Sequence, residues 1–331
     1  MALNFQQIDS SSHVGFKSSF VPPSFYLPSQ INLFLKFVKT EGDQVWITKP
    51  IRSGEGRGIQ LYASSHEFLS TEYPSISIDE ISHGHVNHET VKTIKKKMVV
   101  SKYIKNPLLI NGKKFDMRLY VLVVGARSQN EQDRAYLYQD GIVRLASEDY
   151  NESTETLHNH FIHLTNNTIN DKKNKIQHET IVEKYGFFCN MNLDELQNYF
   201  KTQNMEWKPL WNRLKRLVRE SLNFTIFCKE HQDGNFQQTR HRCFELYGFD
   251  ILVDCHLNPY LLEVNSMPDL SGVSQSSHLV LKKDFCVKSN MLVNAMNLVG
   301  IPILTHDTTE LDCETRPTFC ENALLDQFTK L

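Results

Sequence analysis

The sequence predicts an α+β fold made of two sub-domains, and three observations support this prediction. The chain has 331 residues, which is enough for two hydrophobic cores. Short runs of β-branched and aromatic residues alternate with turn-forming residues, most clearly between Cys243 and Leu270, and this pattern indicates antiparallel strands. Apolar residues recur with the helical period after Asn192 and between Trp207 and Phe224, which indicates two amphipathic helices.

The composition is that of an ordinary globular protein. Hydrophobic residues make up 40% of the chain, charged residues make up 22%, and the formal net charge is −2. So small a net charge gives no global field that would attract nucleic acid or an anionic membrane. The N-terminus contains no apolar signal segment, and the longest apolar run, Leu119 to Ala126, is too short to span a bilayer. The seven cysteines form no CxxC pair, so we expect reduced thiols and a cytoplasmic location. Because the net charge is small and no apolar run could span a bilayer, we expect no nucleic-acid or membrane partner.

Two strands between Cys243 and Leu270 are predicted to bring two carboxylates together. If Asp254 pairs with Pro259 across the turn, antiparallel pairing places Asp250 directly opposite Glu263, with Asn265 on the same face as Glu263. Facing carboxylates repel each other, and a Mg²⁺ ion would resolve the conflict because it binds one or two carboxylates together with substrate phosphates. The alternative is that one carboxylate points to solvent or meets a lysine elsewhere in the chain.

The N-terminal region is predicted to begin outside the folded domain. Residues 1–21 are rich in serine, and we expect a disordered extension there. A short amphipathic helix should follow, and its apolar positions are Leu33, Leu35, Phe37 and Val38.

A strand, a glycine-rich loop and a second strand come next. The first strand, Gln44 to Pro50, carries Lys49 at its end, and the second strand runs from Ile59 to Tyr62. Such a layout can lay backbone N–H groups along a polyphosphate while the lysine neutralises its charge. The alternative is an ordinary hairpin turn. The candidate loop residues are Gly54, Gly56, Arg57 and Gly58.

Residues 63–97 are polar, and we expect a loop with one helix. The segment contains His83, His85 and His88, but short polar histidine runs in loops are more often solvated than bound to zinc. Lysines between residues 92 and 97 favour a solvated face, with contact to an acidic partner as the alternative.

The strand predicted from Lys114 to Val124 carries charges on one face. Period-2 alternation places Lys114, Asp116 and Arg118 together, opposite a face of apolar residues. These charges need either a ligand or water, so the alternative is an exposed sheet edge. The dipeptide Asn111-Gly112 predicts a tight turn before this strand.

Other polar groups follow apolar segments at predicted strand or helix ends. A buried strand is predicted from Met98 to Ile104 and contains Lys102. Two further strands are predicted near Ala135 to Tyr138 and Ile142 to Leu145, and the second carries Arg144. The segment from His163 to Asn167 should lie at the end of a strand or short helix.

These pieces, in this order, suit a nucleotide held between two sheets with Mg²⁺ at its phosphates. The chain resembles the ATP-grasp fold and, within it, the tubulin tyrosine ligase-like family, over about Pro22 to Pro302. The motifs that carry the resemblance are WITKP with GEGRGI, SKYIKNPLLINGKKFDMRLYVLV, HLTNN and FELYGFDILVDCHLNPYLLEVNSMPDL. Their details look most like the tubulin polyglutamylase branch.

The resemblance implies two α+β sub-domains that clamp a nucleotide between antiparallel sheets. The first spans about residues 22–104 and contains the phosphate loop, the second spans 105–302 and contains the metal hairpin, and a polar tail covers 303–331. The implied activity is ATP- and Mg²⁺-dependent addition of glutamate to glutamate side chains in tubulin C-terminal tails, through an acyl phosphate. The implied partners are tubulin tails or microtubules and free L-glutamate, at the cytoskeleton, with the cilium and basal body as candidate locations.

The resemblance also assigns roles to individual residues. Asp250, Glu263 and Asn265 match the family's ligands for Mg²⁺ and phosphate, while Arg118 and Arg144 match its catalytic arginines near the terminal phosphate and the acidic substrate groups. The residues that match its ATP-binding positions are Lys49, Gly54, Gly56, Arg57, Gly58, Lys102, Tyr103, Ile104, Lys114, Asp116, Thr165 and Asn166.

Two alternative functions remain open at this point. The first is an ATP-grasp carboxylate–amine ligase that uses another amino acid, such as glycine, or a non-tubulin acceptor. The second is a tubulin-binding member without turnover, which should lack a metal ligand or a phosphate-binding lysine.

Overall fold

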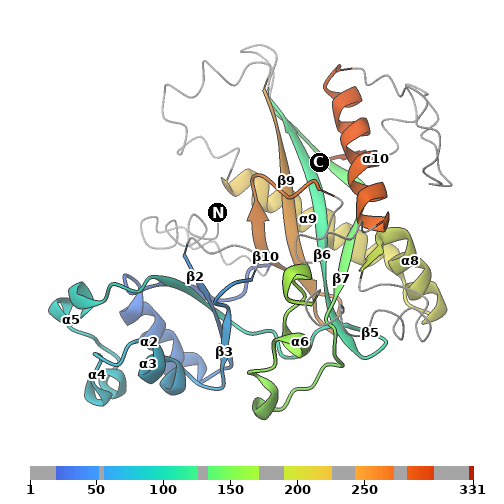
Figure 1. Cartoon of the computed structure of the whole chain (residues 1–331). Coiled ribbons are helices and arrows are strands. Elements are labelled where there is room, and N and C mark those ends of the chain that lie inside the picture. Colours follow the sequence, from blue (N-terminus) through green and yellow to red (C-terminus); the bar gives the residue numbers. More distant parts are fainter. Residues whose placement is uncertain are drawn as a thin grey trace.

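The computed structural model describes residues 20–51, 56–125, 133–170, 190–225, 243–271, 282–301 and 328–331. Two antiparallel sheets with helices packed against them confirm the predicted α+β class (Figure 1). Most of the predicted N-terminal extension and most of the predicted tail lie outside the described residues, so the sub-domain boundaries stay predictions.

The smaller sheet has the strand order β1-β4-β2-β3 and lies at the lower left of Figure 1. Its strands are β1 (Ser24–Leu27), β2 (Trp46–Pro50), β3 (Gln60–Tyr62) and β4 (Met98–Lys102). Aromatic residues dominate its core, where Phe34 packs edge-to-face against both Trp46 and Phe68.

Helix α2 (Ile31–Glu41) covers this core, and the predicted apolar positions Leu35, Phe37 and Val38 pack against it. Ile31, Phe34 and Leu35 are buried, whereas Leu33 is 48% exposed, so its prediction as a core position was wrong. The helical period explains the difference, because residues 31, 34 and 35 lie on one face and residue 33 does not.

Residues 63–97 form three helices where one was expected: α3 (Ser65–Glu72), α4 (Ile78–His83) and α5 (His88–Thr93). Ser64, Ser77 and Asn87 cap their N-termini, and Ser77 with Glu80 forms a capping box. These cap residues are the sequence signal that the segment offers for its helices.

The larger sheet has the order β10-β9-β6-β7-β11, with β5 paired to β6 and β8 paired to β7. Its strands are β5 (Leu109–Ile110), β6 (Lys113–Val124), β7 (Arg134–Leu145), β8 (Asn190–Asn192), β9 (Phe244–Val253), β10 (Pro259–Asn265) and β11 (Phe328–Lys330). The two strands predicted around residues 135–145 are one irregular strand, β7, whose register against β6 shifts between Leu119 and Val121. Strand β11 was not predicted from the sequence, and its buried Phe328 packs against Tyr138 of β7.

Strand β6 lies in the middle of the larger sheet, between β9 and β7, as Figure 1 shows. Its odd-numbered residues, including Phe115 and Leu119, enter the core beneath α8 (Leu193–Thr202) and α9 (Trp207–Thr225). Lys114, Asp116 and Arg118 face the opposite side, as predicted. Because β6 is paired on both sides, the alternative of an exposed sheet edge is wrong.

Local signals at turns and helix starts are confirmed. Asn111 and Gly112 both have positive φ, 49° and 80°, as a two-residue hairpin turn requires. Asn192 caps α8 and forms a capping box with Glu195.

Helix α10 (Lys282–Leu298) packs on the same face of the larger sheet as the predicted charged residues. Val287 and Met291 contact the cluster that contains Tyr120 and Ile142.

Cys286 on α10 is disulfide-bonded, so the expectation of reduced thiols was wrong at this position. Spacing along the chain does not reveal which cysteines meet in space. In the described part of the chain, no helix is long and apolar enough to cross a membrane.

Candidate active site

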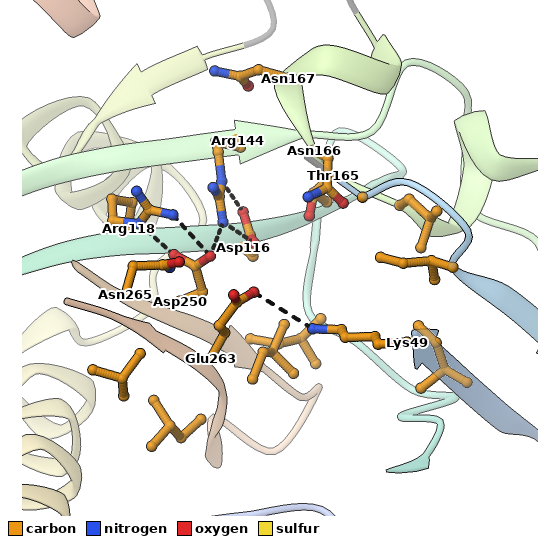
Figure 2. Close-up of a pocket in the computed structure, with 18 of the residues that line it drawn as sticks. Lys49, Asp116, Arg118, Arg144, Thr165, Asn166, Asn167, Asp250, Glu263 and Asn265 are labelled. Carbon is orange, nitrogen blue, oxygen red and sulfur yellow. Dashed lines mark hydrogen bonds and ion pairs between the residues drawn. The ribbon is translucent and has the colours of Figure 1, made fainter. Parts of the chain in front are cut away.

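A cavity of about 530 Å³ lies between the two sheets, with walls from β2, β4, β6, β7, β9 and β10 (Figure 2). It brings together most of the predicted site residues: Lys49, Gly56, Arg57, Lys102, Tyr103, Ile104, Lys114, Asp116, Arg118, Arg144, Thr165, Asn166, Asp250, Glu263 and Asn265. Gly58 is not part of this lining and approaches Pro50 instead, while Gly54 lies outside the described residues.

The β9–β10 hairpin reaches the predicted pairing by a different register. Pro259 pairs with Val253 instead of Asp254, because the Asp254 carboxylate accepts N–H bonds from the turn at 2.9 and 2.8 Å. A bulge between Leu261 and Glu263 then shifts the register by one residue, so that Glu263 lies opposite Asp250 after all.

Asp250 is held by two arginines. Arg118 donates to both of its oxygens, with Nη2 3.0 Å from Oδ2, and Arg144 Nη2 lies 3.1 Å from the same oxygen. Arg144 also donates two hydrogen bonds to Asp116, one of them 2.7 Å long, so acids and bases alternate along a buried strip. Burial opposes ionisation of Asp250, but the charges of Arg144 and Arg118 outweigh it and hold the pKa of Asp250 well below its usual range.

Glu263 faces the cleft and meets the other sheet. Its carboxylate is 3.8 Å from Nζ of Lys49 on β2, as the dashed line in Figure 2 shows, and its side chain is 51% exposed. The amide of Asn265, oriented to satisfy its neighbours, donates to Glu263 at 3.2 Å and accepts from Arg118 at 3.3 Å. The two carboxylates therefore oppose each other, as predicted, and one of them also meets a lysine, as the alternative proposed.

The donor set fits a hard divalent cation. Asp250, Glu263 and Asn265 offer oxygen atoms. Asp250 Oδ1 accepts a hydrogen bond from Arg118 Nε and retains a second lone pair for a cation. Within the described ranges, no three His, Cys, Asp or Glu side chains gather closely enough to hold a metal ion by themselves. An ion here would therefore depend on the Asn265 amide and on substrate oxygens, which is the usual pattern for Mg²⁺.

Lys114 lies in a buried cluster with Tyr103 and His163. Its Nζ donates to Tyr103 Oη at 3.0 Å and to the His163 carbonyl at 2.8 Å, and it lies 4.3 Å from the centre of the Tyr103 ring. Burial lowers the pKa of Lys114 to about 7, although the charge of Asp116 opposes the shift. Burial and the nearby Lys114 charge lower the pKa of His163 to about 4, so its ring is neutral at pH 7.

The end of the glycine-rich loop lies against the segment that follows α6 (His160–His163). A Cβ on Gly56 would lie 3.0 Å from Asn166 Cγ and 2.8 Å from Ile169 Cδ1, and Gly56 has a φ of +74°. Glycine is therefore required where this backbone approaches Asn166.

Several polar and glycine residues of the cavity region were not predicted from the sequence. A Cβ on Gly248 of β9 would lie 2.9 Å from Arg118 Cδ. Glycine at this position therefore leaves space for Arg118, which hydrogen-bonds to Asp250. A glycine inside a strand was the available signal. Tyr120, Asp284 and Lys288 also line the cavity, but two of them come from α10, whose position the sequence does not reveal.

Comparison with known proteins identifies the family. A model described as the tubulin-tyrosine ligase family matches residues 3–300. The chain belongs to the tubulin-tyrosine ligase family. This confirms the resemblance and the ATP-grasp type of fold that it implied.

Individual relatives within the tubulin-tyrosine ligase family are glutamylases by name. The chain is 32% identical to tubulin monoglutamylase TTLL4 of Mus musculus over 85% of its length and 21% of that protein. It is 32% identical to tubulin polyglutamylase TTLL5 of Homo sapiens over 86% of its length and 20% of that protein. It is 30% identical to the probable tubulin polyglutamylase ttll-9 of Caenorhabditis elegans over 86% of its length and 58% of that protein. The chain thus spans about a fifth of the length of the first two relatives.

Proposed function

We propose that this chain is an ATP- and Mg²⁺-dependent ligase that adds glutamate to glutamate side chains in tubulin C-terminal tails. Its membership in the tubulin-tyrosine ligase family and its likeness to named monoglutamylases and polyglutamylases support this substrate class. The corresponding location is the cytoplasmic cytoskeleton, including the cilium or basal body.

One observation carries the proposal: cationic side chains from both sheets face the opposed pair Asp250 and Glu263 across a single cavity. The smaller sheet contributes Lys49 and Lys102, and the larger sheet contributes Lys114, Arg118 and Arg144. A polyphosphate bound among these cations would gain charge-assisted hydrogen bonds from both sides.

The reaction needs positioning and charge neutralisation more than a protein nucleophile. The acceptor carboxylate takes the terminal phosphoryl group of the substrate ATP and forms an acyl phosphate, with ADP as the leaving group. The amine of free glutamate then attacks the acyl carbon, phosphate leaves, and the amine loses a proton as the amide forms. Bound Mg²⁺ would supply neutralisation of phosphate charge.

The residues of the chain divide these tasks. Asp250, Glu263 and Asn265 would hold the metal ion. Arg118 and Arg144 would stabilise the anionic transferring group, because their guanidinium groups are fixed beforehand by Asp250 and Asp116. Residues from Lys102 to Ile104 would line the adenine side, and Lys114 with Asp116 the ribose side, while Gly54 to Gly58, Thr165 and Asn166 would face the phosphates.

A member that binds tubulin without turnover is the less supported alternative. A chain that binds tubulin without turnover should lack a metal ligand or a phosphate-binding lysine. Every such side chain matched in the described residues is present and lies at the cavity.

The direct test is incubation of the purified chain with ATP, Mg²⁺, labelled L-glutamate and tubulin, followed by mass spectrometry of the tubulin tails. We expect added glutamate residues on intact tubulin and none on tubulin whose tails have been cleaved. Glycine in place of glutamate tests the amino acid, and the masses show whether single residues or chains are added. Failure of the wild-type chain to modify intact tubulin, under conditions where it binds ATP, would refute the proposed acceptor.

A further inference from the structure

Two buried polar atoms near α10 have no hydrogen-bond partner in the part of the chain that the structure describes. They are Tyr120 Oη and Asn190 Oδ1, and their side chains are 0% and 7% exposed. A buried polar atom without a partner costs about 1–3 kcal/mol and is rare in native proteins. A partner supplied by a ligand would explain the Tyr120 hydroxyl, because Tyr120 lines the cavity.

Tyr120 lines the cavity together with two charged residues of α10, Asp284 and Lys288. Asp284 is 3% exposed, and the Asn190 amide donates to its two oxygens at 3.0 and 3.1 Å. Lys288 is 7% exposed, and its Nζ donates to the Ser271 carbonyl at 2.5 Å and lies 3.5 Å from Asp269. A carboxylate and an ammonium group are thus held one helical turn apart at the cavity wall.

This group adjoins the arginines of the proposed active site. Tyr120 follows Arg118 by two residues on the same face of β6, and Asn190 lies opposite Arg144 in the pairing of β8 with β7. Burial raises the pKa of the Tyr120 hydroxyl, and the charges of Arg118, Asp284 and Arg144 all act on it. The hydroxyl therefore lies within the electrostatic reach of both arginines and of Asp284.

The same group lies away from the nucleotide side of the cavity. Lys102, Tyr103 and Ile104 come from the end of β4 in the smaller sheet, whereas Asp284 and Lys288 come from α10. Figure 1 shows α10 at the upper right and the smaller sheet at the lower left, with the strands of the larger sheet between them. We call the part of the cavity that is lined by Tyr120, Asp284 and Lys288 the second compartment.

The chemistry of this second compartment suits a zwitterion. An ammonium group has three N–H donors, and the compartment offers the acceptors Tyr120 Oη and the Asp284 carboxylate, with Asn190 Oδ1 beside them. Lys288 offers positive charge to a carboxylate on the same ligand. A phosphate alone would be repelled by Asp284, so an anion does not match this compartment as well as a free α-amino acid does.

We propose that Tyr120, Asp284 and Lys288 bind the free amino acid, with the first two accepting hydrogen bonds from its α-ammonium group and Lys288 pairing with a carboxylate. This inference rests on the proposed ligase function and identifies where its amino-acid substrate binds. It also places the amine beside Arg118 and Arg144, where the transferring group would be stabilised.

The sharpest variant is Tyr120→Phe, which removes only the unpartnered hydroxyl. We expect the KM for L-glutamate to rise about 10- to 100-fold, as loss of a hydrogen bond to a charged group predicts, while the KM for ATP stays within about twofold. The midpoint of thermal unfolding should stay the same or rise, because the hydroxyl has no partner to lose. An unchanged KM for L-glutamate would overturn the inference and leave an ordered water as the partner of Tyr120.

A binding measurement without turnover tests the same site. L-Glutamate should raise the unfolding temperature of the wild-type chain more than glutarate does, because glutarate has the carboxylates but no ammonium group. Tyr120→Phe should reduce this difference, and Lys288→Met should weaken binding of both compounds. Equal stabilisation of the wild-type chain by the two compounds would contradict recognition of the ammonium group.

The two readouts separate failure of the inference from failure of the proposed function. If the wild-type chain transfers glutamate and Tyr120→Phe does so with an unchanged KM, only the inference fails. If no acceptor is modified but L-glutamate is still preferred over glutarate through Tyr120, the binding site is supported and the proposed function fails.

Discussion

Arg118 on β6 and Asp250 on β9 lie directly opposite each other and are joined by two hydrogen bonds, the Nη2–Oδ2 bond being 3.0 Å long. Asp250 is 6% exposed, so this pair is a buried element of the fold as well as part of the candidate site. Glu263, which lies opposite Asp250 on the other strand, is half-exposed, and it has a 3.8 Å ion pair with Lys49 and a 3.2 Å hydrogen bond from Asn265. The two carboxylates should therefore respond differently to mutation.

Asp250→Asn should reduce both activity and stability, whereas Glu263→Gln should reduce mainly activity. Removing the Asp250 charge leaves Arg118 and Arg144 buried without it, which costs about 3–5 kcal/mol of unfolding free energy. The exposed Lys49–Glu263 pair is worth at most about 1 kcal/mol. Both variants should lower glutamate transfer at least about 100-fold, because each removes an oxygen that would hold the metal ion.

Urea unfolding and a transfer assay measured on the same preparations check this prediction. Wild-type transfer rates in Asp250→Asn would refute the metal role of Asp250. A stability loss in Glu263→Gln as large as that in Asp250→Asn would contradict the difference in burial.

Gly248→Ala should disrupt the position of Arg118. The added methyl group would lie 2.9 Å from Arg118 Cδ and 3.0 Å from Pro268 Cβ, which is too close for either contact to remain unchanged. We expect the unfolding free energy to fall by about 1–3 kcal/mol because of overpacking. Transfer activity should fall by a larger fraction than the unfolding free energy does, because Arg118 belongs to the candidate site.

A double-mutant cycle with Arg118→Ala tests the cause. In the Arg118→Ala background the extra methyl group has more room, so its effect on unfolding free energy should shrink. Equal effects in both backgrounds would show that Gly248 acts independently of Arg118.

Much of the candidate site could be predicted because strand alternation is a local rule. It placed Lys114, Asp116 and Arg118 on one face of β6, and it placed Asn265 on the face of Glu263. The opposition of Asp250 and Glu263 was predicted correctly from an incorrect turn register, because the bulge between Leu261 and Glu263 made up the missing residue. Neither the bulge nor the role of Asp254 within the turn follows from hydrophobic pattern alone.

Contacts between distant elements could not be predicted in this way. Arg213 lies on the exposed side of α9, yet it donates to two carbonyls in the turn of the β9–β10 hairpin. Asp284 and Lys288 reach the cavity because α10 packs on Tyr120 and Ile142, and nothing in their local sequence indicates that position. Leu33 was misplaced because the residues buried on α2 are set by where the helix meets the sheet.

Arg213→Ala should destabilise the hairpin turn. Arg213 Nη1 donates to the carbonyls of His256 and Leu257 at 3.1 and 2.8 Å, and Leu257 holds a positive φ of 62°. Because these bonds are exposed, we expect a loss of about 1 kcal/mol in unfolding free energy. Arg219→Ala, at another exposed arginine of α9, is the matched control and should change stability by less than about 0.5 kcal/mol. Equal effects of the two substitutions in urea unfolding would show that the turn does not depend on Arg213.

Lys114 should make stability rise with pH above neutrality. Its pKa is about 7 in the folded chain because it is buried, and about 10.5 when it is exposed on unfolding. Between these values the unfolded chain binds more protons than the folded chain, so the unfolding free energy should increase by up to about 1.4 kcal/mol per pH unit. Below pH 7 both forms are protonated and this contribution to the slope disappears. In Lys114→Met, the unfolding free energy should rise less steeply between pH 7 and 10 than in the wild-type chain, as measured by urea unfolding across that range.

Nucleotide binding should reverse the shift at Lys114 and take up a proton. At pH 8 the buried amine is mostly neutral in the free chain, and an anionic nucleotide in the cavity would favour its charged form. Calorimetric titration with a non-hydrolysable ATP analogue, in buffers with different ionisation enthalpies, should therefore show uptake approaching about one proton at pH 8 and little uptake at pH 6. Lys114→Met should bind the analogue more weakly and without the pH 8 uptake. Proton uptake that persists in Lys114→Met would assign it to another group, and absence of uptake in the wild-type chain would show that the nucleotide leaves Lys114 neutral.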